Sequence, residues 1–336
     1  MAEDKSLDTK NYVNVLSWWG YLDDPRIAEA VKDQCGVNLS VDEYYTNEEF
    51  SEIFKKHQDR YDVIVFSNLM YKSIENKIAD NNSTLSDVAK GYYPYFRDYY
   101  FQHNYPKNVV FFSHALMGFM YNPAVMQITP GEDIFDIFKS AKNNYVVVVD
   151  DPAEIRSLLT LGYKTSGQVW PKNTYDSEGM VELNYNNFKR VSQNTNIFTT
   201  NDYNQIYKLN NFAMSFMWSG DSILYIQQSH KPYKFILDPK LSYICTDLLA
   251  QIKNSQPASC VAHVLESPKV MAYVENSTYY FSPYFQDSVD DPRFHALYGQ
   301  TAKMLPKLSW IEPVSDFPQY DQEWEALKIK LNEKDN

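Results

Sequence analysis

The chain has 336 residues, of which 44% are hydrophobic and 16% aromatic, so it can bury the cores of two lobes. Its 43 acidic residues outnumber its 31 Lys and Arg, and the formal net charge of −12 disfavours nucleic acid and anionic lipid as partners. No apolar run reaches the roughly 18 residues that a membrane helix needs. This balance favours a cationic small molecule as ligand.

The first residues, 1–11, form a polar N-terminal segment that lacks the apolar core of a secretory leader. Two interpretations stay open at this point: the chain is cytoplasmic, or its leader has been removed. From Tyr12 the pattern predicts a strand, followed by a helix that Asp24 and Pro25 begin and Gly36 ends. The next predicted elements are a strand at 37–41, a helix opened by Asn47, and a buried strand at 61–67.

The middle of the chain starts a second α/β series. Residues 91–106 are crowded with Tyr and Phe and show no clear period, which predicts a long surface loop. The later predicted elements are strands at 108–112 and 118–122, a strand at 146–150, a helix from Pro152, a strand at 196–200, a helix after Asn201, strands at 212–218 and 243–247, and helices at 260–274 and 324–331. Alternating strands and helices predict mostly parallel sheets with helices on both faces.

These two series are not separated by a flexible linker. We therefore expect strands to cross between the lobes, with a ligand cleft at the carboxyl ends of the sheets. The junction VVVVDDPAE carries Asp151, Pro152 and Glu154, which is a typical helix start: an acidic N-cap, a proline and a glutamate three residues on. Capping and ligand binding are compatible, because a capping carboxylate keeps unused lone pairs.

Aromatic residues gather at two predicted strand ends. In SWWGY, Trp18 and Trp19 are adjacent on a strand and point to opposite faces, so one ring should face the cleft. In FMWSGDS, Trp218 stands at a strand end, and Asp221 is expected to be the next N-cap. Such rings are more often core or interface residues than ligand contacts, and both interpretations stay open.

An acid in an apolar stretch is the least expected feature. Asp247 lies within YICTDLL, where an isolated carboxylate would be costly unless it is paired or hydrogen-bonded. Tyr280 in TYYFSPY either walls a cleft or fills the core. Carboxylates and rings without basic partners match an organic polyamine, whose ammonium groups each gain about 0.5–2 kcal/mol from a ring face.

The sequence resembles the periplasmic spermidine/putrescine-binding proteins, the substrate-binding components of polyamine ABC transporters. The likeness lies in an ordered series of individually weak motifs, which are VLSWWGYLDDP, DRYDVIVFS, GFMYNPAVM, VVDDPAEIRSLLTLGYKTS, FMWSGDS, CTDLL, YFSP and LSW. It implies an α/β, two-lobed periplasmic-binding-protein type II fold with two crossover strands. The lobes would comprise 12–117 plus 248–285 and 118–247 plus 286–330.

The resemblance also implies a function and a set of site residues. The protein would be a periplasmic, monomeric solute-binding protein that captures a polyamine in the interlobe cleft and delivers it to an ABC permease, with no catalysis, no cofactor and no nucleic acid. The matching ligand-binding residues are Trp18, Tyr21, Ser67, Asp151, Glu154, Trp218, Asp247 and Tyr280. The chain departs from the family pattern at four positions: Gly20 stands where the family has a glutamate, Leu69 near a tyrosine, Cys245 at a tryptophan and Ile311 close to a glutamine.

Three other functions compete with polyamine transport. The fold could present another cationic ligand to a sensor partner. Paired carboxylates could also serve a glycosidase, although Asp151 and Glu154 share one helix turn, which suits that reaction poorly. Ferric-ion binding is disfavoured because no paired tyrosines stand beside a histidine. No GxSxG, P-loop, GxGxxG or HExxH motif occurs.

The cysteines follow no metal-binding spacing. Cys35, Cys245 and Cys260 are an odd number, so they cannot all pair within one chain. We expect mostly buried thiols, with one disulfide allowed and its pairing left open.

Overall fold

The computed structural model describes residues 11–78, 83–141, 144–152, 154, 155, 157, 158, 161, 196–200, 212–311, 321, 322, 324–326, 328 and 329. Among these residues, no helix combines the length and apolar character needed to cross a membrane. The chain divides into two compact units, unit 1 (residues 1–67, 74–114 and 246–289) and unit 2 (residues 68–73, 115–245 and 290–336). Each unit is described by itself below.

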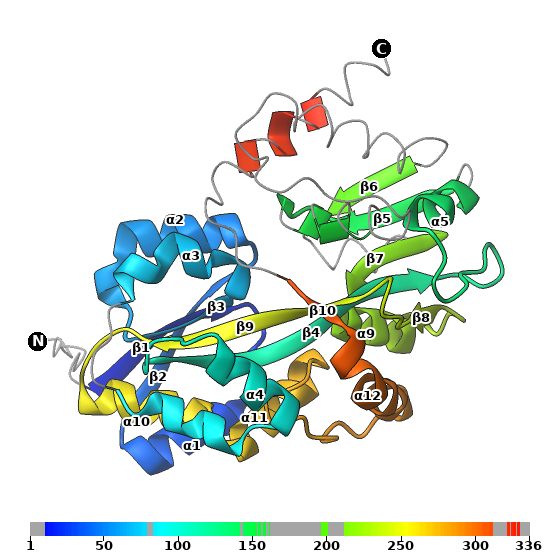
Figure 1. Cartoon of the computed structure of the whole chain (residues 1–336). Helices are drawn as coiled ribbons and strands as arrows, with labels where there is room; N and C mark the ends of the chain where they lie inside the picture. The colour runs from blue at the N-terminus through cyan, green and yellow to red at the C-terminus, as the bar shows by residue number, and fades with distance from the viewer. Residues whose placement is uncertain are drawn as a thin grey trace, which may run out of the picture. The chain divides into compact units, whose positions relative to one another are not determined.

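Unit 1 is built on a sheet with parallel and antiparallel pairs (Figure 1). Its strands are β1 (Tyr12–Trp18), β2 (Asn38–Tyr44), β3 (Val63–Ser67) and the later part of β9 (Tyr243–Gln251). β1 pairs in parallel with both β2 and β3, whereas β3 and β9 are antiparallel. The last residues of the parallel strands therefore lie at one edge of the sheet, and Asp247 of β9 lies opposite Ser67 at that edge.

The first helix, α1 (Pro25–Cys35), begins and ends where the sequence predicts. The Asp24 side chain accepts a hydrogen bond from the Arg26 N–H, and Gly36 ends the helix with a left-handed φ of 69°. A disulfide between Cys35 and Cys260 joins α1 to α10 (Gln256–Leu265). The expectation of mostly buried thiols is wrong for these two residues, which are half-buried and oxidised.

Two other predicted helix boundaries in unit 1 need correction. α2 (Asn47–His57) is capped by Thr46, whose hydroxyl accepts the Glu49 N–H at 3.1 Å. The helix predicted at 260–274 is two helices, α10 and α11 (Pro268–Thr278), because Ser267 caps a new helix that Pro268 begins.

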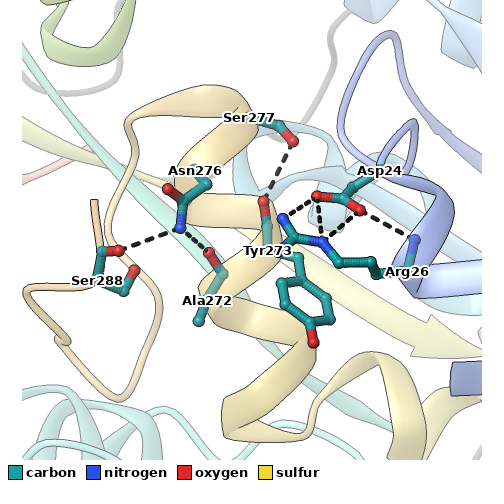
Figure 2. Close-up of polar contacts among 7 residues, drawn as sticks. All are labelled: Asp24, Arg26, Ala272, Tyr273, Asn276, Ser277 and Ser288. Atoms are coloured by element: carbon teal, nitrogen blue, oxygen red, sulfur yellow. Dashed lines mark hydrogen bonds and ion pairs between the residues drawn. The ribbon is translucent and has the colours of Figure 1, made fainter. Parts of the chain in front are cut away.

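Polar contacts hold α11 against α1 and against the segment that follows it (Figure 2). The Arg26 guanidinium binds Asp24 and lies 4.1 Å from the centroid of the Tyr273 ring. The Asn276 side-chain amide donates to the Ala272 carbonyl at 2.7 Å and to the Ser288 carbonyl at 3.2 Å. These contacts fix both ends of the segment 279–287, which contains Tyr280.

The Tyr- and Phe-rich stretch at 91–106 is not the predicted surface loop. A 3₁₀ helix, η5 (Leu85–Gly91), leads into α4 (Pro94–Gln102), which buries Phe96 and Tyr100. The Tyr100 hydroxyl donates to the Val109 carbonyl at 2.7 Å. Aromatic residues occupy every side of this short helix, so no apolar stripe marks its period in the sequence.

Unit 2 has its own mixed sheet. Its elements are the later part of β4 (Val109–Tyr121), α5 (Ile134–Ser140), β5 (Tyr145–Val149), β6 (Asn196–Thr200), β7 (Met214–Trp218), α9 (Ser219–Ser229), β8 (Lys234–Ile236), the start of β9, α12 (Pro292–Met304) and β10 (Ser309–Trp310). β5 is parallel to β6 and β7, and β4 is antiparallel to β7 and β8. The carboxyl ends of β5 and β7 consequently lie at the same edge, next to Asp151 and Trp218.

The two strands predicted at 108–112 and 118–122 are one continuous strand. β4 is buried throughout and passes from unit 1 to unit 2, as β9 does. Gly118 does not mark a turn: a Cβ atom there would lie 2.8 Å from the Phe235 ring and 2.9 Å from the Ile236 carbonyl. The glycine instead permits the close approach of β8 to β4.

The remaining predictions in unit 2 have mixed outcomes. α9 begins at Ser219 with Trp218 at the N-cap, so Asp221 lies in its first turn and is not the N-cap. The described residues at 152–158 are helical, as predicted from Pro152. The helix predicted after Asn201 lies outside the described residues.

Candidate functional site

The carboxylate of Asp247 is the centre of a polar group at the sheet edge of unit 1. Its Oδ1 accepts a hydrogen bond from Trp18 Nε1 at 3.1 Å, and its Oδ2 accepts from Tyr21 Oη at 2.7 Å and Ser113 Oγ at 2.9 Å. All of these donors are neutral, and they come from β1, the turn after β1, and β4. We call Trp18, Tyr21, Ser113, Asp247 and Tyr280 the Asp247 group.

The electrostatics of this group favour a positive charge from outside. Burial raises the pKa of Asp247 to about 6, and the hydrogen bonds from Tyr21, Ser113 and Trp18 limit that rise. In the described part of the chain, no Lys, Arg or His forms an ion pair with Asp247. An ionised carboxylate can accept about four hydrogen bonds, so Oδ1 keeps capacity for one more donor.

Two of the donors to Asp247, Trp18 and Tyr21, contact further aromatic rings. The Tyr21 ring lies 6.1 Å from the Tyr280 ring in an edge-to-face arrangement, and the Trp18 ring lies 4.5 Å from that of Tyr44. Ser67 is the β3 residue opposite Asp247 in the antiparallel register. The structure thus brings together all of the predicted site residues that belong to unit 1.

A second group of polar side chains forms at the sheet edge of unit 2 around Glu154. Its Oε2 accepts from Tyr243 Oη at 2.5 Å, and its Oε1 accepts from Trp218 Nε1 at 3.3 Å and Cys245 Sγ at 3.6 Å. Asp151 caps the same helix by accepting the Glu154 N–H at 3.1 Å. We call these five residues the Glu154 group.

Burial dominates the electrostatics of the Glu154 group. The exposed fractions of Glu154 and Asp151 are only 4% and 8%. Burial first, and the charge of Asp151 second, raise the pKa of Glu154 to about 8, while its hydrogen bonds oppose the rise. The carboxyl of Glu154 is therefore mostly protonated at neutral pH.

Three members of these groups are not among the predicted site residues. Ser113 and Tyr243 carry no motif, and each reaches its carboxylate across a long sequence separation, 134 residues for Ser113 and 89 for Tyr243. Cys245, noted in the sequence only as a departure, places its thiol against Glu154.

The other departures take structural positions. The Gly20 N–H donates to Glu43 Oε1 at 2.8 Å, and Leu69 and Ile311 are buried.

Comparison with solved structures identifies the fold. A putative spermidine/putrescine ABC transporter protein from Listeria monocytogenes is 15% identical with a TM-score of 0.73, over 95% of this chain and 99% of that one. The spermidine/putrescine ABC transporter substrate-binding protein PotD from Streptococcus pneumoniae is 14% identical with a TM-score of 0.70, over 96% of this chain and 98% of that one. Iron-bound HitA from Pseudomonas aeruginosa is 12% identical with a TM-score of 0.63, over 96% of this chain and 99% of that one.

The similarity to these structures extends over nearly the whole chain, and at such low identity it establishes the fold alone. No protein-family model and no curated protein matches the sequence. The predicted two-lobed α/β fold of the periplasmic binding proteins is confirmed, and so is the resemblance to spermidine/putrescine-binding proteins at the level of structure. The ligands of proteins with this fold differ: one of the similar structures is iron-bound.

Proposed function

We propose that this protein is the solute-binding component of an ABC importer and that it captures a polyamine such as spermidine or putrescine for delivery to a membrane permease. The observation that carries this proposal is the state of Asp247. Three neutral donors hold its carboxylate in a fixed orientation, and no ion pair in the described residues neutralises it. A half-buried carboxylate without a counter-ion is unfavourable, and an ammonium group would relieve that cost.

The rings of the Asp247 group suit the rest of an amine ligand. The faces of Trp18, Tyr21 and Tyr280 can contact methylene groups and attract the positive charge, at about 0.5–2 kcal/mol per cation–π contact. The single accepting position left on Oδ1 suits one N–H of a terminal ammonium. Asp247 is accordingly proposed as the anchor of one end of the ligand.

The Glu154 group is proposed as a second place that binds an ammonium nitrogen of a polyamine. Asp151, Glu154 and Trp218 combine two buried carboxyl groups with an indole, and no Lys or Arg in the described residues forms an ion pair with Glu154. These are the features of the Asp247 group in a second place.

The disulfide supports an extracytoplasmic location. Disulfides persist in oxidising compartments such as the periplasm and are rare in the cytosol. The bond between Cys35 and Cys260 joins parts of the chain 225 residues apart. Together with the fold, it favours the periplasm as the place where the protein acts as a monomeric binding protein.

Calorimetric titration with spermidine and putrescine tests the proposal. We expect saturable binding at one ligand per chain without turnover, and a loss of at least about 100-fold in affinity in Asp247→Asn, because an unpaired buried ammonium costs about 3 kcal/mol or more. Asp33→Asn is the matched control: it removes the same charge from an exposed position on α1 in the same unit.

The control variant should bind like the wild type. If wild-type protein showed neither heat nor a thermal shift with these amines, the polyamine assignment would be wrong. Undiminished binding by Asp247→Asn would show instead that the anchor is misplaced.

A further inference from the structure

A buried tryptophan near the end of the chain contacts the residue that precedes the Glu154 helix. The described residues between 321 and 329 are helical, and we call them the C-terminal helix. Trp324 of this helix has an exposed fraction of 4%, and its Nε1 donates to Asp150 Oδ1 at 2.6 Å. Lys328 lies one turn further along the same helix face and places its ammonium 3.2 Å from the same oxygen. All of these residues belong to unit 2.

Asp150 connects β5 to the helix that carries Glu154. It follows Val149, the last residue of β5, and precedes Asp151. The Asp151 side chain accepts the Glu154 N–H at 3.1 Å, and its carbonyl accepts the Ile155 N–H at 3.0 Å. One planar peptide unit therefore separates the residue held by the C-terminal helix from the residue that caps the Glu154 helix. Because the backbone has only two soft dihedral angles per residue, a shift of Asp150 would displace this cap.

The two adjacent aspartates have different roles. A helix start needs one capping side chain, which Asp151 supplies, so capping leaves the contacts of Asp150 unexplained. Asp150 instead receives an indole N–H and an ammonium group, both from the C-terminal helix. Hydrogen bonds to an ionised carboxylate are shorter and stronger than those between neutral groups, so this double contact holds Asp150 firmly.

We propose that Trp324 and Lys328 are positioning residues for the bound amine, because by holding Asp150 they fix the turn that places the Glu154 carboxyl. This inference rests on the proposed function of the Glu154 group and deepens it by giving the C-terminal helix a part in ligand binding. The chain's own ammonium neutralises Asp150, which leaves Glu154 for the ligand.

The surroundings of Glu154 make its placement sensitive to this turn. Trp218 Nε1 at the end of β7 donates to it at 3.3 Å, and Tyr243 Oη on β9 donates at 2.5 Å. These donors come from strands, whereas the carboxyl comes from the helix after Asp150. A displaced helix start would separate the carboxyl from both donors, and an incoming ammonium would then have to order the acceptor itself.

Trp324→Phe is the informative variant, because it removes the N–H donor and leaves every charge in place. We expect it to weaken spermidine binding in calorimetry by about 3- to 30-fold, the range of couplings within one hydrogen-bond network. In a Glu154→Gln background the same change should weaken binding by less than about 2-fold, since the residue through which it acts is already altered. Lys328→Arg keeps the ion pair and should bind like the wild type. Glu325→Gln is the matched control, because it removes an exposed carboxylate from the same helix and leaves both contacts of Asp150 intact.

A measurement without ligand separates this inference from the proposed function. Burial raises the pKa of Glu154 to about 8. Carboxyl NMR of isotope-labelled glutamate, with the resonance assigned through Glu154→Gln, follows this titration in the free protein. Trp324→Phe should lower the pKa toward its ordinary value, because a displaced carboxyl is less buried. If the wild type binds no polyamine but Trp324→Phe lowers this pKa, the proposed function is wrong and the positioning stands.

Other outcomes overturn the positioning role. It is wrong if Trp324→Phe leaves the affinity and the pKa of Glu154 unchanged, or if it weakens spermidine binding equally in the two backgrounds. Thermal melting verifies that each variant is folded, and a lower melting temperature with unchanged affinity would show a purely structural contact. Should Trp324→Phe fail to fold, Lys328→Gln replaces it in both backgrounds, since the difference between the backgrounds carries the test.

Discussion

Binding of a polyamine should release a proton from Glu154. Burial raises the pKa of Glu154 to about 8 and that of Asp247 to about 6. At pH 7 the protonated fraction is therefore about 0.9 for Glu154 and about 0.1 for Asp247. A bound ammonium favours the ionised form of each carboxyl. If both are carboxylates in the complex, about one proton leaves for each ligand bound at pH 7.

The direction of the pH dependence follows from the same pKa values. Because the ligand must displace protons, lowering the pH weakens binding, by about 17-fold between pH 7 and pH 6. Below pH 6 the decline steepens, since Asp247 also becomes protonated. The groups that face Glu154 are Asp151 on its own helix, Trp218 on β7, and Tyr243 and Cys245 on β9.

Calorimetry in two buffers of different ionisation enthalpy measures the released protons directly. The wild type should release about one proton at pH 7, and Glu154→Gln should release about 0.1, since Asp247 alone then contributes. The affinity of this variant should also become nearly independent of pH above about 6.5. A wild type that binds spermidine at pH 7 without releasing a proton would refute the reasoning.

Two further predictions concern stability in unit 1. The single hydroxyl proton of Tyr92 faces two acceptors, the Phe111 carbonyl at 3.0 Å and Glu266 Oε2 at 3.1 Å, and burial raises the pKa of Glu266 well above its ordinary value. Because the pKa of Glu266 is raised in the folded protein, the stability of the wild type falls as the pH rises, whereas that of Glu266→Gln does not. The melting temperature of Glu266→Gln should therefore rise relative to that of the wild type from pH 5 to pH 8. A melting temperature of Glu266→Gln below that of the wild type at pH 8 would contradict a neutral Glu266. Replacing both Cys35 and Cys260 by Ser should lower the free energy of unfolding by about 2–4 kcal/mol without changing the affinity for spermidine, measured by urea unfolding and calorimetry, and an unchanged midpoint would contradict a stabilising role.

Local signals in the sequence located the elements that carry the site. Asp24 and Gly36 mark the ends of α1, and Asp151 marks the start of the helix that carries Glu154, because caps act within a single turn. These signals failed where the role of a residue depends on a contact with a distant part of the chain. The sequence predicts separate strands at 108–112 and 118–122, yet Gly118 lies inside one unbroken strand, where its small size permits the contact with β8.

The same limit applies to the candidate site. Asp247 was identifiable because a carboxylate in an apolar stretch needs a partner. Its partner Ser113 was not identifiable, since nothing in the sequence indicates that β4 places a hydroxyl against the β9 carboxylate. The pairing of Cys35 with Cys260 was equally inaccessible, because it depends on how α1 packs against α10.

Under the proposed function, the free energy that raises these pKa values would also provide selectivity for cations. Moving the pKa of Glu154 from 4.5 to about 8 corresponds to about 5 kcal/mol disfavouring its ionised form, as an upper limit. A neutral solute leaves that form disfavoured and gains nothing from the carboxyl's charge. An ammonium group recovers part of this energy by stabilising the carboxylate. Asp247, with a pKa of about 6, is mostly ionised at pH 7 and has less to recover. In the proposed function the two carboxyls would therefore differ: Asp247 would attract the cation from the start, and Glu154 would discriminate between solutes through proton release.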